Sequence, residues 1–161
     1  MPVTETGYLC VADRVAELGL HVPNGFAILP DNFAQAISSR DFRLGAETTA
    51  VRALFQGCQL PLENFAHGDE SGLAERTDDS WMITLFAPAG AVKREASALS
   101  GALQAISDHL KGLPPKSPRR SVSLSLIVER GSDRMCRKLT CEDDISGFAA
   151  LAVKATRIAD M

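Results

Sequence analysis

The sequence predicts an α+β fold, in which a helix-rich N-terminal part is followed by a β-α-β-β-α unit that begins near residue 81. The strongest observation is a helical pattern: apolar residues recur at alternating spacings of four and three throughout residues 91–113. Extended apolar runs lie on either side of it, at 81–86 and at 121–130. The shares of hydrophobic residues, 45%, and of charged residues, 23%, are ordinary for a globular domain of 161 residues.

The N-terminal part, residues 1–62, is predicted to consist mostly of short helices. Residues 5–18 are expected to form the first one, because their apolar side chains recur at helical spacing and Gly19 is placed to end the helix. A further helix is expected over 47–56. The apolar run at 26–29 lies between an Asn-Gly turn and a proline, and it fits either a short strand or a buried loop.

Residues 63–80 are predicted to be an acidic loop or linker. They carry six acidic residues and one basic residue, a net charge of −5, and show little hydrophobic periodicity. The chain before them carries −2 and residues 81–161 carry +4, so the segment separates a weakly acidic part from a mildly basic one. A loop of this length is unusual inside a compact domain, and it predicts a boundary between residues 1–62 and a sandwich formed by residues 81–161.

The strand at 81–86, the helix at 91–113 and the strand at 121–130 are predicted to form the core of the C-terminal unit. The helix is long enough to cover the second strand from end to end. A strand-helix-strand unit of this length implies a parallel pair of strands. The same spacing fits a coiled-coil seam, but the positions beside the apolar stripe carry few charges, so packing on a sheet is favoured.

A hairpin and a last helix are expected to complete the unit. A turn follows residue 130, and residues 135–142 have the pattern of the return strand. Asp143 or Asp144 is then placed to cap the last helix. This element order resembles a ferredoxin-like sandwich without its last strand, and the resemblance is one of topology only. The missing strand is either absent or supplied by residues 26–29 or by a second chain.

The strand at 121–130 presents two different faces. Its apolar residues at even positions are expected to face the long helix, and Ser123, Ser125 and Ile127 are expected on the opposite face. The two serines leave that face shallow, while Ile127 and the strand at 81–86 add apolar surface to it. We therefore expect the N-terminal helices, a second copy of the chain or another protein to cover it, and we take the three residues as a candidate interaction face.

A second hypothesis places a small-molecule site at the C-terminal ends of the two parallel strands, where open α/β sheets bind ligands. The candidate residues are Gly90, Glu129, Arg130 and Arg134. Under this hypothesis the chain is a small-molecule-binding protein or an enzyme. No Gly-x-Gly-x-x-Gly and no Gly-Lys-Ser/Thr accompanies the turn before the long helix, so a phosphate-binding loop is disfavoured.

The sequence contains no recognisable catalytic set or metal-binding motif. The four cysteines form no Cys-x-x-Cys pair and the three histidines lie far apart, so we predict no disulfide framework, no metal site and no cofactor. No apolar run approaches the roughly 20 residues that a membrane span needs. The first residues lack the basic and apolar regions of a signal peptide, which predicts a cytoplasmic protein.

These observations favour a non-catalytic protein-interaction or regulatory module of a cytosolic system, whose partner is another protein or a second copy of the chain. Nucleic acid is disfavoured by the net charge of −3 and by the lack of aromatic residues among the basic residues at 111–120. A third hypothesis is autoinhibition, in which the acidic segment at 63–80 lies over the basic C-terminal half.

Overall fold

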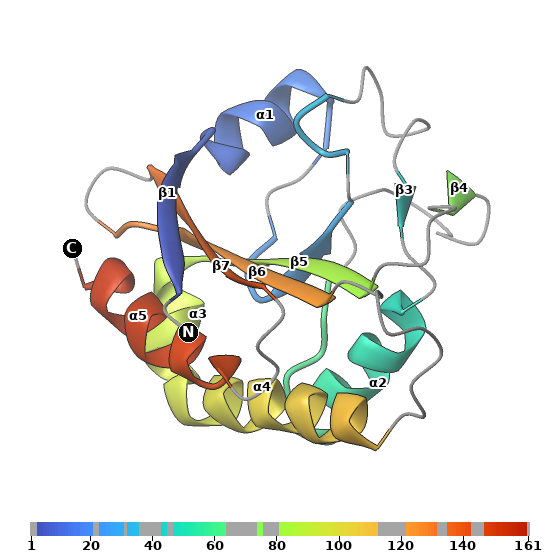
Figure 1. Cartoon of the computed structure of the whole chain (residues 1–161). Helices are drawn as coiled ribbons and strands as arrows, with labels where there is room; N and C mark the ends of the chain where they lie inside the picture. Colours follow the sequence, from blue (N-terminus) through green and yellow to red (C-terminus); the bar gives the residue numbers. More distant parts are fainter. Residues whose placement is uncertain are drawn as a thin grey trace.

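The computed structural model contains a mixed sheet of five strands with helices on both faces (Figure 1). Its strands are β1 (Thr4–Tyr8), β2 (Ala27–Leu29), β5 (Trp81–Ala87), β6 (Val122–Glu129) and β7 (Cys136–Glu142), and β3 (Arg43–Leu44) and β4 (Ala74–Glu75) form a separate short pair. Its helices are α1 (Val11–Glu17), α2 (Thr48–Gly57), α3 (Ala89–Arg94), α4 (Ala96–Lys111) and α5 (Ala150–Ala159). The residues that the structure describes are 3–20, 23–30, 32–35, 43–44, 47–63, 74–75, 81–112, 122–131, 135–142 and 147–160.

The order of the strands in the main sheet is β1-β7-β6-β5-β2. Strands β5 and β6 are parallel neighbours, and every other pairing in this sheet is antiparallel. The predicted α+β class, the parallel pair and the β6–β7 hairpin are thus confirmed. The ferredoxin-like label is not confirmed. In that split arrangement a third strand lies between the two parallel strands, whereas here β5 and β6 are adjacent and β7 lies beyond β6.

The two faces of the sheet bury two separate clusters, because successive side chains of a strand point to opposite faces. In β6 the residues at even positions, among them Leu124 and Leu126, lie in the larger cluster, as the alternation predicts. Ile127 lies in the smaller cluster on the other face. Figure 1 shows α1 alone on one side of the sheet and the other helices on the opposite side.

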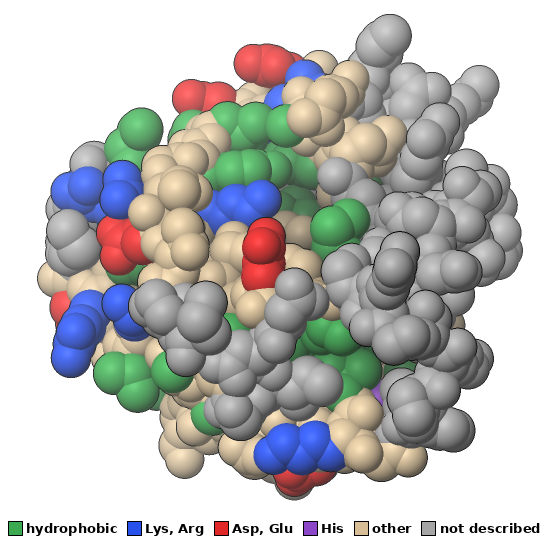
Figure 2. Space-filling view, viewed as in Figure 1, with side chains coloured by type: hydrophobic (Ala, Val, Ile, Leu, Met, Phe, Trp, Pro, Cys, Tyr) green, Lys and Arg blue, Asp and Glu red, His purple; other side chains and the backbone are tan. Residues whose placement is uncertain are grey.

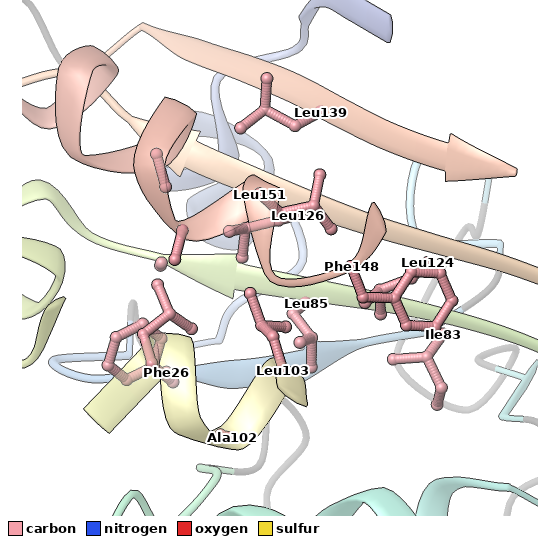
Figure 3. Packing of buried hydrophobic residues seen from close by; sticks show 14 of the residues in the cluster. Phe26, Ile83, Leu85, Ala102, Leu103, Leu124, Leu126, Leu139, Phe148 and Leu151 are labelled. Atoms are coloured by element: carbon pink, nitrogen blue, oxygen red, sulfur yellow. The ribbon is translucent and has the colours of Figure 1, made fainter. Parts of the chain in front are cut away.

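The larger cluster lies between the sheet and the helices α2 to α5. Leu103 of α4 and Leu151 of α5 are fully buried in it, together with Leu124 and Leu126 of β6 (Figure 3). Each such side chain contributes about 1.5–3 kcal/mol of burial free energy before its entropy is counted. The rings of Trp81 and Phe148 stack with their centroids 6.2 Å apart, so β5 and the turn before α5 close one end of this cluster.

The smaller cluster lies under α1. Val11 and Val15 of α1 pack with Phe33 on Phe86 and Ile127, all buried. The guanidinium of Arg14 donates a hydrogen bond from Nε to the Phe33 carbonyl at 3.2 Å, which holds the segment after β2 against α1. The cluster covers the ends of β5 and β6 that are nearer to Phe86 and Ile127, and the opposite ends of these strands lie outside it.

The prediction of a first helix over residues 5–18 is wrong for its first part. Residues 4–8 form the edge strand β1, and the helix begins only at Val11. Thr4, Thr6 and Gly7 are poor helix formers, and the threonines favour a strand once β7 is available for pairing. Tyr8 nevertheless packs beside the cluster under α1. This packing explains why Tyr8 fits the helical spacing of the apolar residues that follow it in the sequence.

The prediction of one straight helix over residues 91–113 is also corrected. A break at Glu95, where φ is −121° and ψ is 26°, separates α3 from α4. The hydrogen bonds from the Glu95 N–H to the Ala91 carbonyl and from the Leu99 N–H to the Glu95 carbonyl continue across it, at 2.9 and 2.8 Å. The apolar repeat survives this bend because it records only which side of the helix is buried.

The N-terminal part and the C-terminal unit share the main sheet. Residues 27–29 pair antiparallel with β5, so they supply a strand, as one of the expected alternatives has it. Most of the acidic segment at 63–80, including its expected loop structure, lies outside the described residues. The predicted caps Asp143 and Asp144 also lie outside them, and α5 begins at Ala150.

Candidate interaction surface

The predicted interaction face is only partly accessible. Ile127 is 0% exposed and packs in the cluster under α1, so a partner reaches it only if α1 is displaced. Ser125 is buried, and its Oγ lies 3.2 Å from Oγ1 of Thr140 in a hydrogen bond. Ser123 is half-buried. The N-terminal part, one of the three expected occupants, therefore covers the Ile127 end of this face, and Ser123 is the residue that a partner can reach.

A row of hydroxyl side chains crosses the sheet at the border of the α1 cluster. The strand registers align Thr4 of β1 with Thr140 of β7, Thr140 with Ser125 of β6, and Ser125 with Thr84 of β5. Ser125 and Thr140 share one hydrogen bond between their hydroxyl groups, which lowers the cost of placing small polar groups within the sheet. The row ends at β1, so it leads from the middle of the sheet to its edge.

Strand β1 is an exposed edge of the sheet. It pairs with β7 on one side, and no other described strand pairs with its outer side. Four of its five residues, Thr4 to Gly7, are exposed. Because backbone groups of an antiparallel strand point alternately to its two sides, half of the N–H and C=O groups of β1 face outward. Such groups form a template for one further strand.

The opposite edge strand, β2, is buried, and its outer side is partly paired. All three of its residues are buried. Glu63 forms a parallel bridge to Ala27, and its N–H donates a hydrogen bond to the Phe26 carbonyl at 2.9 Å. The outer side of β2 is therefore partly occupied by the chain itself, and β1 is the accessible edge.

An ion pair between Arg137 and Glu5 joins β7 to β1 on the face of the sheet that carries α5. Arg137 is the register partner of Gly7, and its Nη1 atom lies 3.7 Å from the position that a Cβ would take there. Its Nε and Nη2 atoms each lie 3.0 Å from Oε2 of Glu5. The side chains of Arg137 and Glu5 are 35% and 38% exposed. Basic and acidic side chains thus lie next to one another beside β1 (Figure 2).

Tyr8 connects the end of β1 to α1. Its half-buried ring lies below the ammonium group of Lys138, with Nζ 5.9 Å from the ring centroid, a cation–π contact. Burial, followed by the neighbouring Cys136, raises the pKa of the Tyr8 hydroxyl above its ordinary value of 10.0, and Arg14 opposes this shift. The hydroxyl is therefore protonated at neutral pH and is available as a hydrogen-bond donor.

The alternative ligand site is crowded by the end of α5. Glu129 ends β6, Arg130 follows it, and Gly90 lies exposed at the start of α3, while Arg134 is outside the described residues. The Arg130 N–H donates to the Met135 carbonyl at 2.8 Å, so this segment closes the hairpin.

Gly131 shows how little space remains at these strand ends. A Cβ at Gly131 would lie 3.2 Å from the Ala159 carbonyl oxygen and 3.7 Å from the Ala89 Cβ. The C-terminal end of α5 thus occupies part of the crevice, and its carbonyl oxygens disfavour an anion there. The Nζ atom of Lys93 lies 3.8 Å from Oδ1 of Asp160. One positive charge near these strand ends is therefore already paired.

Sequence reasoning identified Ser123 and Ser125 but missed the other hydroxyl residues, β1 and the Glu5–Arg137 pair. Thr4, Thr84 and Thr140 become neighbours only through the strand registers, and no local pattern marks them. Two alternate threonines, Thr4 and Thr6, beside a glycine near the N-terminus were the available signal for an edge strand.

Across the described ranges, no group of three histidine, cysteine, aspartate or glutamate side chains could hold a metal ion. No helix in the same part of the chain is long and apolar enough to cross a membrane. Comparisons of this chain with protein-family models, with curated proteins and with solved structures find no match.

Proposed function

We propose that this chain is a non-catalytic protein-interaction module that binds an extended segment of its partner at the free edge of β1. The observation that carries the proposal is the contrast between the two edges of the sheet. Four of the five residues of β1 are exposed, whereas β2 is buried and bridged by Glu63. Strand addition to an open edge is a recurring mode of peptide recognition, in which backbone hydrogen bonds supply much of the affinity.

Side chains on both faces of β1 supply selectivity for the added strand. Thr4, the last residue of the hydroxyl row, and Thr6 lie on the face that carries α1 and suit β-branched or hydroxyl partners. Glu5 and Arg137 lie on the other face and suit a charged partner residue. The small-molecule alternative has less support, because the end of α5 approaches Gly131 at the strand ends where its ligand would lie.

A peptide-display selection tests this proposal. Random peptides are selected against the chain immobilised at low density, and bound peptides are expected to slow amide hydrogen exchange in residues 4–8. Two adjacent variants, Thr6→Pro and Gly7→Pro, serve as a matched pair, because successive N–H groups point to opposite sides of the strand. In one of the two variants, the residue that is replaced has its N–H on the outer side of β1. That variant is expected to keep its fold and to stop binding the selected peptides.

The other variant loses a hydrogen bond to β7, and its stability is expected to fall. If the selected peptides protect amides elsewhere and leave residues 4–8 unchanged, or if both proline variants bind them normally, the edge is not the binding site. If repeated selections return no binders and the amides of residues 4–8 exchange freely at all concentrations of the chain, the proposed function is wrong.

A further inference from the structure

We infer that the partner at this edge is a second copy of the same chain, with the two β1 strands antiparallel about a two-fold axis at Thr6. The inference rests on the proposed function and names its partner. The resulting sheet would run continuously through both copies, with the two Thr6 residues facing each other at its centre.

The residues of β1 are complementary to themselves in this register. Pairing about Thr6 places Glu5 opposite Gly7 of the second copy, and Thr4 opposite Tyr8. The two Glu5 side chains do not face each other, so the acidic residue meets no like charge directly. Thr6 meets its own equivalent, and paired threonines stabilise neighbouring strands.

Arg137 gives the charge complementarity that favours a second copy over an unrelated strand. Its guanidinium already lies across Gly7, with Nη1 close to the empty Cβ position. In the paired register, that is the position opposite Glu5 of the second copy. Arg137 donates a hydrogen bond from Nε to its own Glu5 and places Nη2 3.0 Å from the same carboxylate oxygen, so Nη1 remains to pair with the incoming carboxylate. Two glutamates and two arginines would then form one symmetric cluster.

The glycine at position 7 leaves room for this cluster. A Cβ there would meet Nη1 of Arg137 at 3.7 Å, an ordinary contact, and a side chain that extended beyond Cβ would compete with the incoming Glu5 for the same space. An unrelated strand would need an acidic residue opposite Gly7 in order to pair with Arg137. A second copy of β1 provides this residue, which is Glu5.

The geometry also predicts that assembly stops at two chains. Both copies use the same edge, so the interface is isologous and closes on itself. The remaining edge of each copy is β2, whose residues are buried and which is bridged by Glu63. Within the part of the main sheet that the structure describes, a further chain therefore finds no second exposed edge to extend.

Charge reversal with complementation tests this inference. Sedimentation and native mass spectrometry of the full chain are expected to show a dimer. Glu5→Arg and Arg137→Glu are each expected to weaken dimerisation about tenfold or more, because each places like charges across the axis. An equimolar mixture of these two variants is expected to form a heterodimer.

The mixture distinguishes contacts between chains from contacts within a chain. Both variants have lost their internal Glu5–Arg137 pair, so only pairs formed across the axis can restore the dimer. The matched control for Glu5→Arg is Asp108→Arg, which makes the same change in net charge on the exposed side of α4 and is expected to leave the dimer intact.

A wild-type chain that stays monomeric, a dimer that persists in both single variants, or a mixture that stays monomeric overturns the inference. The peptide selection keeps this failure separate from failure of the proposed function. A monomer whose β1 binds selected peptides overturns the second copy alone. A chain that binds no peptide at β1, and whose β1 amides exchange freely at all concentrations, overturns both.

Discussion

At the residue scale, Tyr8 joins the free edge of the sheet to the cluster under α1. Its ring is covered by Lys138, and its backbone is paired with Cys136 of β7. Burial disfavours the charged form of the hydroxyl, and the neighbouring cysteine adds to this effect. Tyr8 with its hydroxyl protonated therefore contributes to holding β1 in place. The ionisation of this hydroxyl is thereby linked to the stability of the accessible edge.

We predict that Tyr8 titrates above pH 10.0 in the folded protein. Because folding raises its pKa, the stabilisation by Tyr8 is complete below about pH 10 and is lost as the pH rises through the folded-state pKa. The chain has one tyrosine, so the absorbance of tyrosinate reports Tyr8 alone. The denatured chain is the reference, and a folded-state midpoint at or below that of the denatured chain would contradict the burial described above.

At the element scale, two glycines show where helix packing is tight and where it is loose. Gly101 lies in the exposed part of α4, and a Cβ added there meets nothing within 4 Å. Gly131 follows β6, and a Cβ added there meets the Ala159 carbonyl at 3.2 Å. The position of α5 is therefore coupled to the end of β6 by backbone contact.

Substitution of the two glycines by alanine is expected to have opposite effects. Gly101→Ala should stabilise the protein by about 0.5–1 kcal/mol, because alanine favours the helix and restricts the unfolded chain. Gly131→Ala should destabilise it by about 1 kcal/mol or more, because the end of α5 has to shift. Urea denaturation measures both free energies of unfolding. Equal stabilisation by the two variants would mean that α5 does not pack against Gly131.

At the scale of the whole molecule, the N-terminal residues complete the sheet on both sides of the β5–β6–β7 core. Strand β1 pairs with β7, β2 pairs with β5, and α1 covers Phe86 and Ile127. Without these elements the C-terminal unit would expose that apolar surface to water.

We therefore predict that the described elements unfold in one cooperative transition, although the length of the loop predicted at 63–80 indicated a boundary there. The single tryptophan, Trp81, is buried in the larger cluster and reports it by fluorescence. Far-ultraviolet circular dichroism reports all helices and strands together. The two denaturation curves should coincide. A second transition seen only by circular dichroism would show that the N-terminal part unfolds independently.

Local patterns predicted the central elements well because those elements are buried. The alternation in β6 identified the face that carries α4, and the repeat in 91–113 identified a helix. The same reasoning missed β1, whose exposed Thr4 and Thr6 leave no apolar alternation, and it missed the bend at Glu95, which no proline marks. Ser125 attracted notice as a polar residue in an apolar strand, but its partner Thr140 could not be identified without the strand register.

By itself, the sequence determined the α+β class, the order of the C-terminal elements and the parallel pair. These depend on which side chains are buried, and burial leaves a periodic signal along the chain. Only the tertiary structure decided that residues 4–8 form an edge, that α1 covers Ile127, and that Arg137 lies across Gly7. These depend on pairing between residues far apart in the chain, whose free energy no local pattern records.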